Sequence, residues 1–133
     1  MRKLCAALAT LALVAGLGLF ASSPAGATGT TFGCRISPGT IFTWNQYCHT
    51  SEAASTYNAG FLVQNAAIPL SYSWSIPSGH AIYSGCGSSD NSCGVLAHQG
   101  DEFEVTVNLT YSDHTESYWS DATIDQWCGN NIC

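Results

Sequence analysis

The stretch that decides the fold runs from Glu102 to Tyr111 and reads Glu-Phe-Glu-Val-Thr-Val-Asn-Leu-Thr-Tyr. Polar and apolar residues alternate through it without interruption, which is typical of a β-strand with one solvent-facing side and one buried side. The buried side carries every second residue: Phe103, Val105, Val107, Leu109 and Tyr111. A shift of one residue would bury Glu102 and Glu104, so the cost of burying two carboxylates fixes the register. At ~1.5–3 kcal/mol for each large apolar side chain, this face contributes on the order of 10 kcal/mol before chain entropy is subtracted.

The first residues have the composition of a secretory signal peptide. Two basic residues precede an apolar run from Leu4 to Phe20, and small residues lead to an A-x-A pattern at positions 25–27. We therefore expect residues 1–27 to be removed and residues 28–133 to form a single secreted, extracellular domain. The alternative is an uncleaved membrane anchor, but the apolar run has only about 17 residues and is rich in Ala and Gly.

The charge of the chain narrows the classes of partner. Without residues 1–27, Arg35 is the only Lys or Arg against nine Asp and Glu residues, which gives a net charge of −8. Such a surface repels phosphate groups and anionic lipids. We therefore expect no nucleic-acid partner and, once the signal is removed, no membrane partner. The mature chain is expected to be a monomer.

Six cysteines remain in the expected mature chain: Cys34, Cys48, Cys86, Cys93, Cys128 and Cys133. An even number in an exported chain predicts three disulfides, although six cysteines allow 15 pairings and spacing alone does not choose among them. We expect sequential pairing, because each pair then brackets a segment rich in turn residues: Cys34 with Cys48, Cys86 with Cys93, and Cys128 with Cys133. There is no C-x-x-C and no His at ligand spacing, so neither a metal nor another cofactor is predicted.

Strand patterns recur on both sides of the central stretch, at residues 41–47, 61–65, 70–76, 81–86, 93–97 and 116–124. Residues 28–31 are expected to be a loosely attached leader, and residues 49–59 a loop with at most one turn of helix. Short strands with frequent Gly, Ser and Pro between them predict an all-β fold, namely an antiparallel β-sandwich stapled by disulfides.

A family resemblance is carried by three stretches: YSWSIPSG at 72–79, GDEFEVTVNLTYSD at 100–113 and ATI at 122–124. Together they resemble the immunoglobulin-like PKD (polycystic kidney disease) repeat family, over residues 55–126. In that family a core Trp on a middle strand, here Trp74, precedes an acidic Gly-rich turn, and the turn in this chain lacks the acidic group. The resemblance implies an immunoglobulin-like sandwich. It also implies interaction rather than catalysis, since PKD repeats are usually interaction or spacer modules.

Trp119 is the main candidate for ligand binding. The alternation that buries Ala122 and Ile124 turns Trp119 outward, beside Asp121 and Thr123. An exposed Trp on a flat sheet face is suited to stacking on a sugar ring or to contacting a protein partner. The alternative is that Trp119 covers the N-terminal segment or the C-terminal turn.

Candidate catalytic residues are few. Glu102 and Glu104 share one side of a strand and form the best acid pair, although a solvated strand face is also typically acidic. Asp113, His114 and Glu116 form at most a weak cation site in a hairpin. The chain has no G-x-S-x-G elbow, no phosphate-binding loop and no free mature cysteine, so no enzymatic activity is predicted.

These patterns together predict a secreted, non-catalytic binding or interaction module for an extracellular carbohydrate or protein. The alternative is a disulfide-rich inhibitor or effector of an extracellular enzyme, which would present the rigid segment between Cys86 and Cys93 to that enzyme. A small hydrolase that uses Glu102 and Glu104 is the third hypothesis.

Overall fold

The computed structural model describes residues 29–129 and 131–133, so the signal peptide predicted at residues 1–27 lies outside the described part. The strands are β1 (Thr31–Ser37), β2 (Tyr47–Thr50), β3 (Tyr57–Gln64), β4 (Ser71–Ser75), β5 (Ile82–Gly85), β6 (Ser92–Ala97), β7 (Glu102–Thr110), β8 (Thr115–Ile124), β9 (Trp127–Cys128) and β10 (Asn131–Ile132). The all-β prediction is confirmed for the described residues, which hold no helix of the length and apolarity that a membrane span requires.

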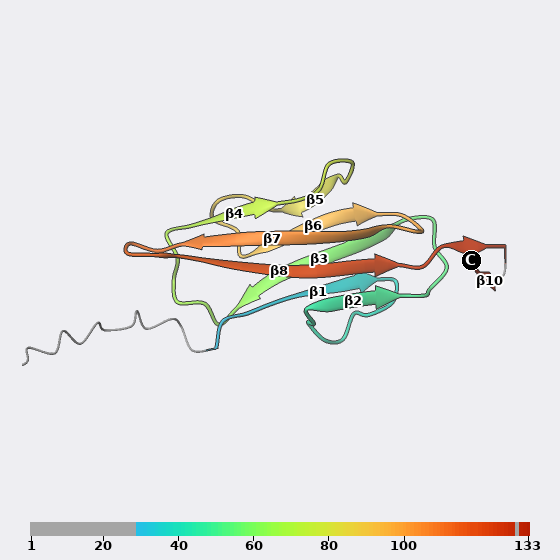
Figure 1. The fold of residues 1–133 in the computed structure, drawn as a ribbon, viewed down its shortest axis with the longest axis horizontal. Helices are drawn as coiled ribbons and strands as arrows, with labels where there is room; N and C mark the ends of the chain where they lie inside the picture. The colour runs from blue at the N-terminus through green and yellow to red at the C-terminus, as the bar shows by residue number, and fades with distance from the viewer. Residues whose placement is uncertain (1–28, 130) are drawn as a thin grey trace, which may run out of the picture.

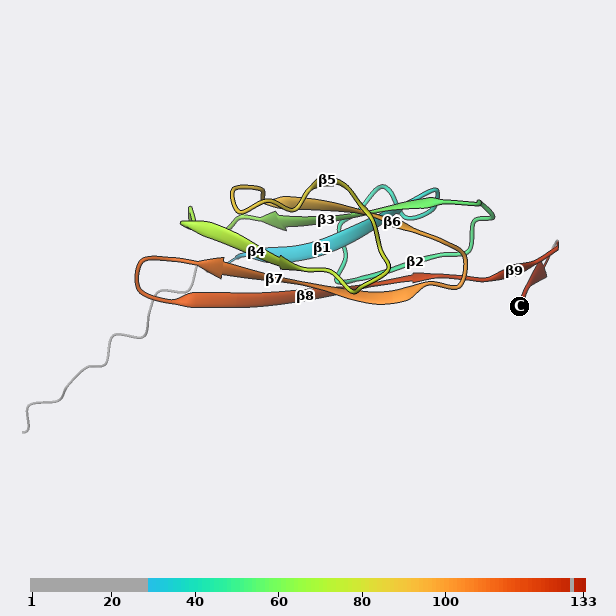
Figure 2. The ribbon, with the colours of Figure 1, turned by 90° about the horizontal axis from the view of Figure 1, so that it is seen from above.

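Two four-stranded sheets lie one above the other (Figure 1 and Figure 2). The first sheet has the order β1-β3-β6-β5 and the second the order β2-β8-β7-β4, while β9 and β10 form a separate hairpin at the C-terminal end. All ladders are antiparallel except that between β2 and β8. The expectation of a wholly antiparallel arrangement is therefore wrong for this pair. The segment before β2 runs back along β1 and then turns again, so β2 points in the same direction as β1 and β8 (Figure 1).

The core lies between the two sheets and is supplied by alternate residues of the strands. Four residues of β7 are at most 5% exposed, as the alternation predicts: Phe103, Val105, Val107 and Leu109. Phe61 of β3 meets Phe103 from the other sheet, with ring centroids 6.1 Å apart. Glu102 and Glu104 are exposed on the opposite side of β7. The predicted register of this strand is therefore confirmed.

β1 is a strand that the sequence patterns do not predict. Its buried residues Phe32, Cys34 and Ile36 do alternate, but Gly33 is also buried, so β1 lacks the regular polar face of β7. Thr31, expected in a loose leader, is paired with Gln64 of β3.

The strand expected at residues 41–47 is wrong. This segment is irregular apart from a single bridge between Asn45 and Cys34, and β2 begins only at Tyr47. Segment 41–46 follows the edge of β1 because the backbone of Asn45 bonds to that of Cys34, and the next residue, Gln46, accepts a bond from Asp121 of β8.

The loop expected at residues 49–59 is wrong at both ends, which belong to β2 and β3. The part between these strands contains no helical turn. The hydroxyl of Tyr57 donates to the carbonyl oxygen of Glu52 at 2.6 Å and accepts from the N–H of Ala54 at 2.9 Å. This buried side chain therefore satisfies backbone groups that a helix would otherwise satisfy.

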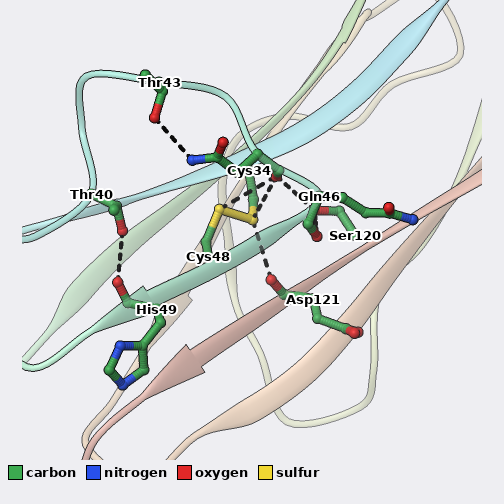
Figure 3. Close-up of a disulfide and its surroundings, with 9 residues drawn as sticks. Cys34, Thr40, Thr43, Gln46, Cys48, His49, Ser120 and Asp121 are labelled. Atoms are coloured by element: carbon green, nitrogen blue, oxygen red, sulfur yellow. Dashed lines mark hydrogen bonds between the residues drawn. A yellow bond between two sulfur atoms is a disulfide. The ribbon is translucent and has the colours of Figure 1, made fainter.

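The three sequential disulfides are confirmed. The pair Cys34–Cys48 is buried and joins β1 of the first sheet to β2 of the second (Figure 3). Two further contacts bind this region to β8. The carbonyl oxygen of Asp121 lies 3.2 Å from Sγ of Cys34, and the hydroxyl of Ser120 donates to the carbonyl oxygen of Gln46 at 2.7 Å. The disulfide and β8 together hold the start of β2 in place.

We expect the double variant Cys34→Ala/Cys48→Ala to lose about 3 kcal/mol of unfolding free energy. Without this disulfide, the unfolded chain is no longer closed into a loop and gains conformational entropy. Urea unfolding of the oxidised proteins measures the loss. The matched control is Cys128→Ala/Cys133→Ala, which opens a shorter loop outside the two sheets and should cost less. Equal losses in the two variants would contradict this account.

Candidate functional site

The side of the second sheet that faces away from the core carries the predicted ligand-binding residues. Trp119, Asp121 and Thr123 alternate along β8 with fully or almost fully buried residues, so all three point outward. Trp119 is 38% exposed, and the other two are half-buried. We call this surface the outer face, and we define it by Tyr47, Glu104, Thr106, Trp119, Asp121 and Thr123.

Trp119 does not stand alone on the outer face. The ring of Tyr47 meets it edge to face, with ring centroids 5.5 Å apart and an angle of 76° between the ring planes. Tyr47 is 64% exposed. It comes next to Trp119 because it lies opposite Asp121 in the parallel β2–β8 pairing. The result is a continuous aromatic surface contributed by two strands that are distant in the sequence.

Polar side chains flank the aromatic pair in register. Across the β7–β8 ladder, Thr106 lies opposite Trp119 and Glu104 lies opposite Asp121. The hydroxyl of Thr106 donates to Oε1 of Glu104 at 3.2 Å. Hydrogen-bond donors and acceptors therefore stand beside an apolar ring surface, which is the arrangement that a sugar ring requires.

The carboxyl group of Asp121, on the outer face, has a shifted pKa. Its pKa is raised, first by its partial removal from water and then by the negative charges of Glu104 and Glu102. Like charges placed directly opposite each other in a ladder are destabilising. The pair of acids thus costs stability and gives this face a strong negative charge.

A hollow of about 460 Å³ lies beside the outer face. Its walls come from the start of β1, the segment before β2 and the middle of β8, and they include Phe32, Trp44, Gln46, Ser117 and Trp119. None of its lining residues is charged. The indole of Trp44 is held in position by the guanidinium of Arg35, which lies 4.2 Å from the ring centroid.

A second group of titratable residues lies at the hairpin between β7 and β8. The His114 ring has Nδ1 2.6 Å from Asp113 and Nε2 3.4 Å from Glu116, and it stacks on Tyr111 at 4.6 Å. The hydrogen bond to Asp113 is the main cause that raises the pKa of His114 and lowers the pKa of Asp113. Within the described part of the chain, no group of three or more His, Cys, Asp or Glu residues is arranged to hold a metal ion.

The segment between Cys86 and Cys93 is tied to the rest of the protein. Three N–H groups of β3 and β4 donate to its carbonyl oxygens at 2.8–3.1 Å: Val63 to Asn91, Tyr72 to Ser88, and Nε1 of Trp74 to Asp90. These bonds connect the segment to both sheets, because β3 belongs to the first and β4 to the second.

No protein family, no curated protein and no solved structure matches this chain. The geometry of the site therefore carries the functional argument.

We expect Asp121→Asn to stabilise the protein at neutral pH, by no more than about 1 kcal/mol, because it removes a charge that is partly withdrawn from water and is repelled by Glu104. The pKa of Asp121 is raised in the folded state, so the folded protein binds this proton more readily than the unfolded chain. The gain should disappear as the pH falls through that pKa. Thermal unfolding from pH 7 to pH 3 measures it. A gain independent of pH would contradict the electrostatic cause.

We expect His114 to titrate above its ordinary value of 6.5, as measured by NMR of the imidazole protons. Asp113→Asn should lower this pKa more than Glu116→Gln, because the bond to Asp113 is the larger cause. The raised pKa adds stability at pH values below 6.5, which is lost as the pH rises through the folded-state pKa. An unshifted titration in the parent protein would show that the hairpin contacts do not form in solution.

Proposed function

We propose that this protein is a secreted, non-catalytic binding module, and that it binds a polysaccharide on the outer face. The observation that carries the proposal is the exposed pair of Trp119 and Tyr47, which is flanked in register by hydroxyl and carboxylate groups. The face of one ring of this pair stacks on the apolar face of a sugar ring while the other ring flanks it, and Thr106 and Asp121 bond to the sugar hydroxyl groups. Binding needs no cofactor.

The charge of the outer face selects the class of polysaccharide. Glu104 and Asp121 lie side by side, and the mature chain expected from the sequence has a net charge of −8. Uronic acids and sulfated sugars are repelled by such a surface. The ligand is therefore a neutral polysaccharide, or one that carries amino groups.

The proposed fold is immunoglobulin-like. The order β1-β3-β6-β5 corresponds to strands A, B, E and D of that fold, and β8-β7-β4 to G, F and C, with β2 as an added edge strand. Trp74 supports the correspondence, because it lies on β4, the equivalent of strand C, and packs against the core and Phe32. A PKD-like repeat remains the family proposed on its sequence motifs, and it agrees with a role in binding.

Catalysis is not proposed for the acids of the outer face. Glu102 and Glu104 are exposed on the strand, and the hollow beside the face is lined by neither of them. Carboxylates that hydrolyse a glycosidic bond flank that bond, whereas Glu102 and Glu104 project from the same face of one strand. On an open sheet face, the same groups act as hydrogen-bond acceptors for hydroxyl groups.

The test is calorimetric titration of the mature protein with soluble β-glucan, xylan and chitin oligosaccharides, with polygalacturonate as the acidic comparison. We expect at least one neutral or amino sugar polymer to bind and polygalacturonate not to bind. Trp119→Ala and Tyr47→Ala should each weaken binding at least about tenfold, or ~1.4 kcal/mol.

The matched control is Trp127→Phe, which changes a Trp on β9, outside the two sheets. It should leave binding unchanged. Thermal unfolding of Trp119→Ala should stay close to that of the parent, because the side chain is not part of the core. The proposal fails if no polysaccharide binds, or if binding survives the loss of Trp119, and protein partners then become the leading class.

A further inference from the structure

The two long sides of the layered structure are closed to different extents. On the side of β4, the segment between Cys86 and Cys93 is bonded to both sheets. On the other side, residues 38–46 and β2 lie beside β1 and the second half of β8 (Figure 1). β2 pairs only with residues 121–124 of β8. Among residues 29–129 and 131–133, no strand therefore pairs with the first half of β8 on this side.

The free backbone groups of this half of β8 can be identified from its pairing. Successive residues of a strand direct their N–H and C=O groups to alternate sides. The N–H of Asp121 donates to the carbonyl oxygen of Gln46 at 2.9 Å, on the side away from β7, and the β7–β8 register contains no bulge. The backbone N–H and C=O groups of Trp119 and Ser117 must therefore also point away from β7, to this open side. No hydrogen bond joins them to another of residues 29–129 and 131–133.

The hollow beside the outer face opens next to these groups. Ser117 and Trp119 belong to its walls, and Phe32 and Trp44 supply aromatic surface. Its volume of about 460 Å³ is within the usual range for ligand pockets. A strand that pairs with β8 here directs alternate side chains toward the hollow.

We propose that residues 117–119 of β8 form a β-addition site for a partner protein. An extended segment of that partner pairs with the free N–H and C=O groups, in line with β2, and places one apolar or aromatic side chain in the hollow. β2 shows that this edge accepts a strand, since its four residues pair with the adjoining part of β8. This interaction goes beyond sugar binding and does not depend on it.

Charge identifies the kind of partner. Two copies of the expected mature chain, each with a net charge of −8, repel each other. The same net negative charge repels an acidic segment of another protein. The occupant is therefore a neutral or basic segment of another protein rather than a second copy of this one.

The first experiment selects binders from a phage-displayed library of random decapeptides on the oxidised chain from Thr28. We expect the enriched peptides, once synthesised, to slow hydrogen exchange at the amides of Ser117 and Trp119. Ser117→Pro removes an N–H at the open edge but no bond to β7, and it should weaken binding at least tenfold. Ser117→Ala keeps the N–H and should therefore lose much less binding than Ser117→Pro.

The second experiment keeps the protein unchanged and N-methylates alternate residues of the best peptide. One peptide carries N-methyl groups at its odd positions and the other at its even positions. Only one of the two should lose binding, because only one set of N–H groups faces β8, and the side chains are the same in both. The proposal is overturned if no enriched peptide protects Ser117 and Trp119, or if both methylated forms bind. A concentration-dependent dimer in sedimentation that Ser117→Pro abolishes would assign the edge to a second copy and overturn the choice of partner.

Discussion

The burial of one face of β7 is the constraint on which the rest of the structure depends. β7 lies between β8 and β4 in the second sheet, so its register determines theirs. Val105 and Val107 have no exposed surface, while Glu102 and Glu104 on the other face require water. The outward direction of Trp119 follows from this register, because Trp119 is paired with the outward-facing Thr106. The arrangement of the proposed binding surface is thus a consequence of core packing in the second sheet.

Elements with strict alternation could be predicted from the sequence. In β7, in β8 and in the strand of Trp74, polar and apolar residues alternate, which distinguishes a solvent-facing side from a buried side. The disulfide pairs could be predicted because each pair brackets a turn-rich segment. β1 and β2 could not be predicted in this way. β1 buries a glycine between Phe32 and Cys34, and the place of β2 depends on a parallel pairing with residues more than 70 positions away. Such long-range pairing leaves no local pattern.

The same distinction applies to the candidate site. The outward positions of Trp119, Asp121 and Thr123 follow from alternation within one strand, and the structure agrees. The contribution of Tyr47 could not be predicted, because it reaches Trp119 only through the β2–β8 pairing. The hollow and the open edge of β8 are also invisible in the sequence, since both arise from where β2 begins.

The disulfide between Cys34 and Cys48 also has a consequence for the order of maturation. It fixes the start of β2, which covers residues 121–124 of β8. While both thiols are reduced, this tether is missing and the whole edge of β8 is available to other unfinished chains, an arrangement that promotes aggregation. Oxidation of this one pair therefore favours the covering of residues 121–124 of β8 by β2. With β2 in place, the part of β8 that β2 leaves uncovered shortens from residues 115–124 to residues 115–120.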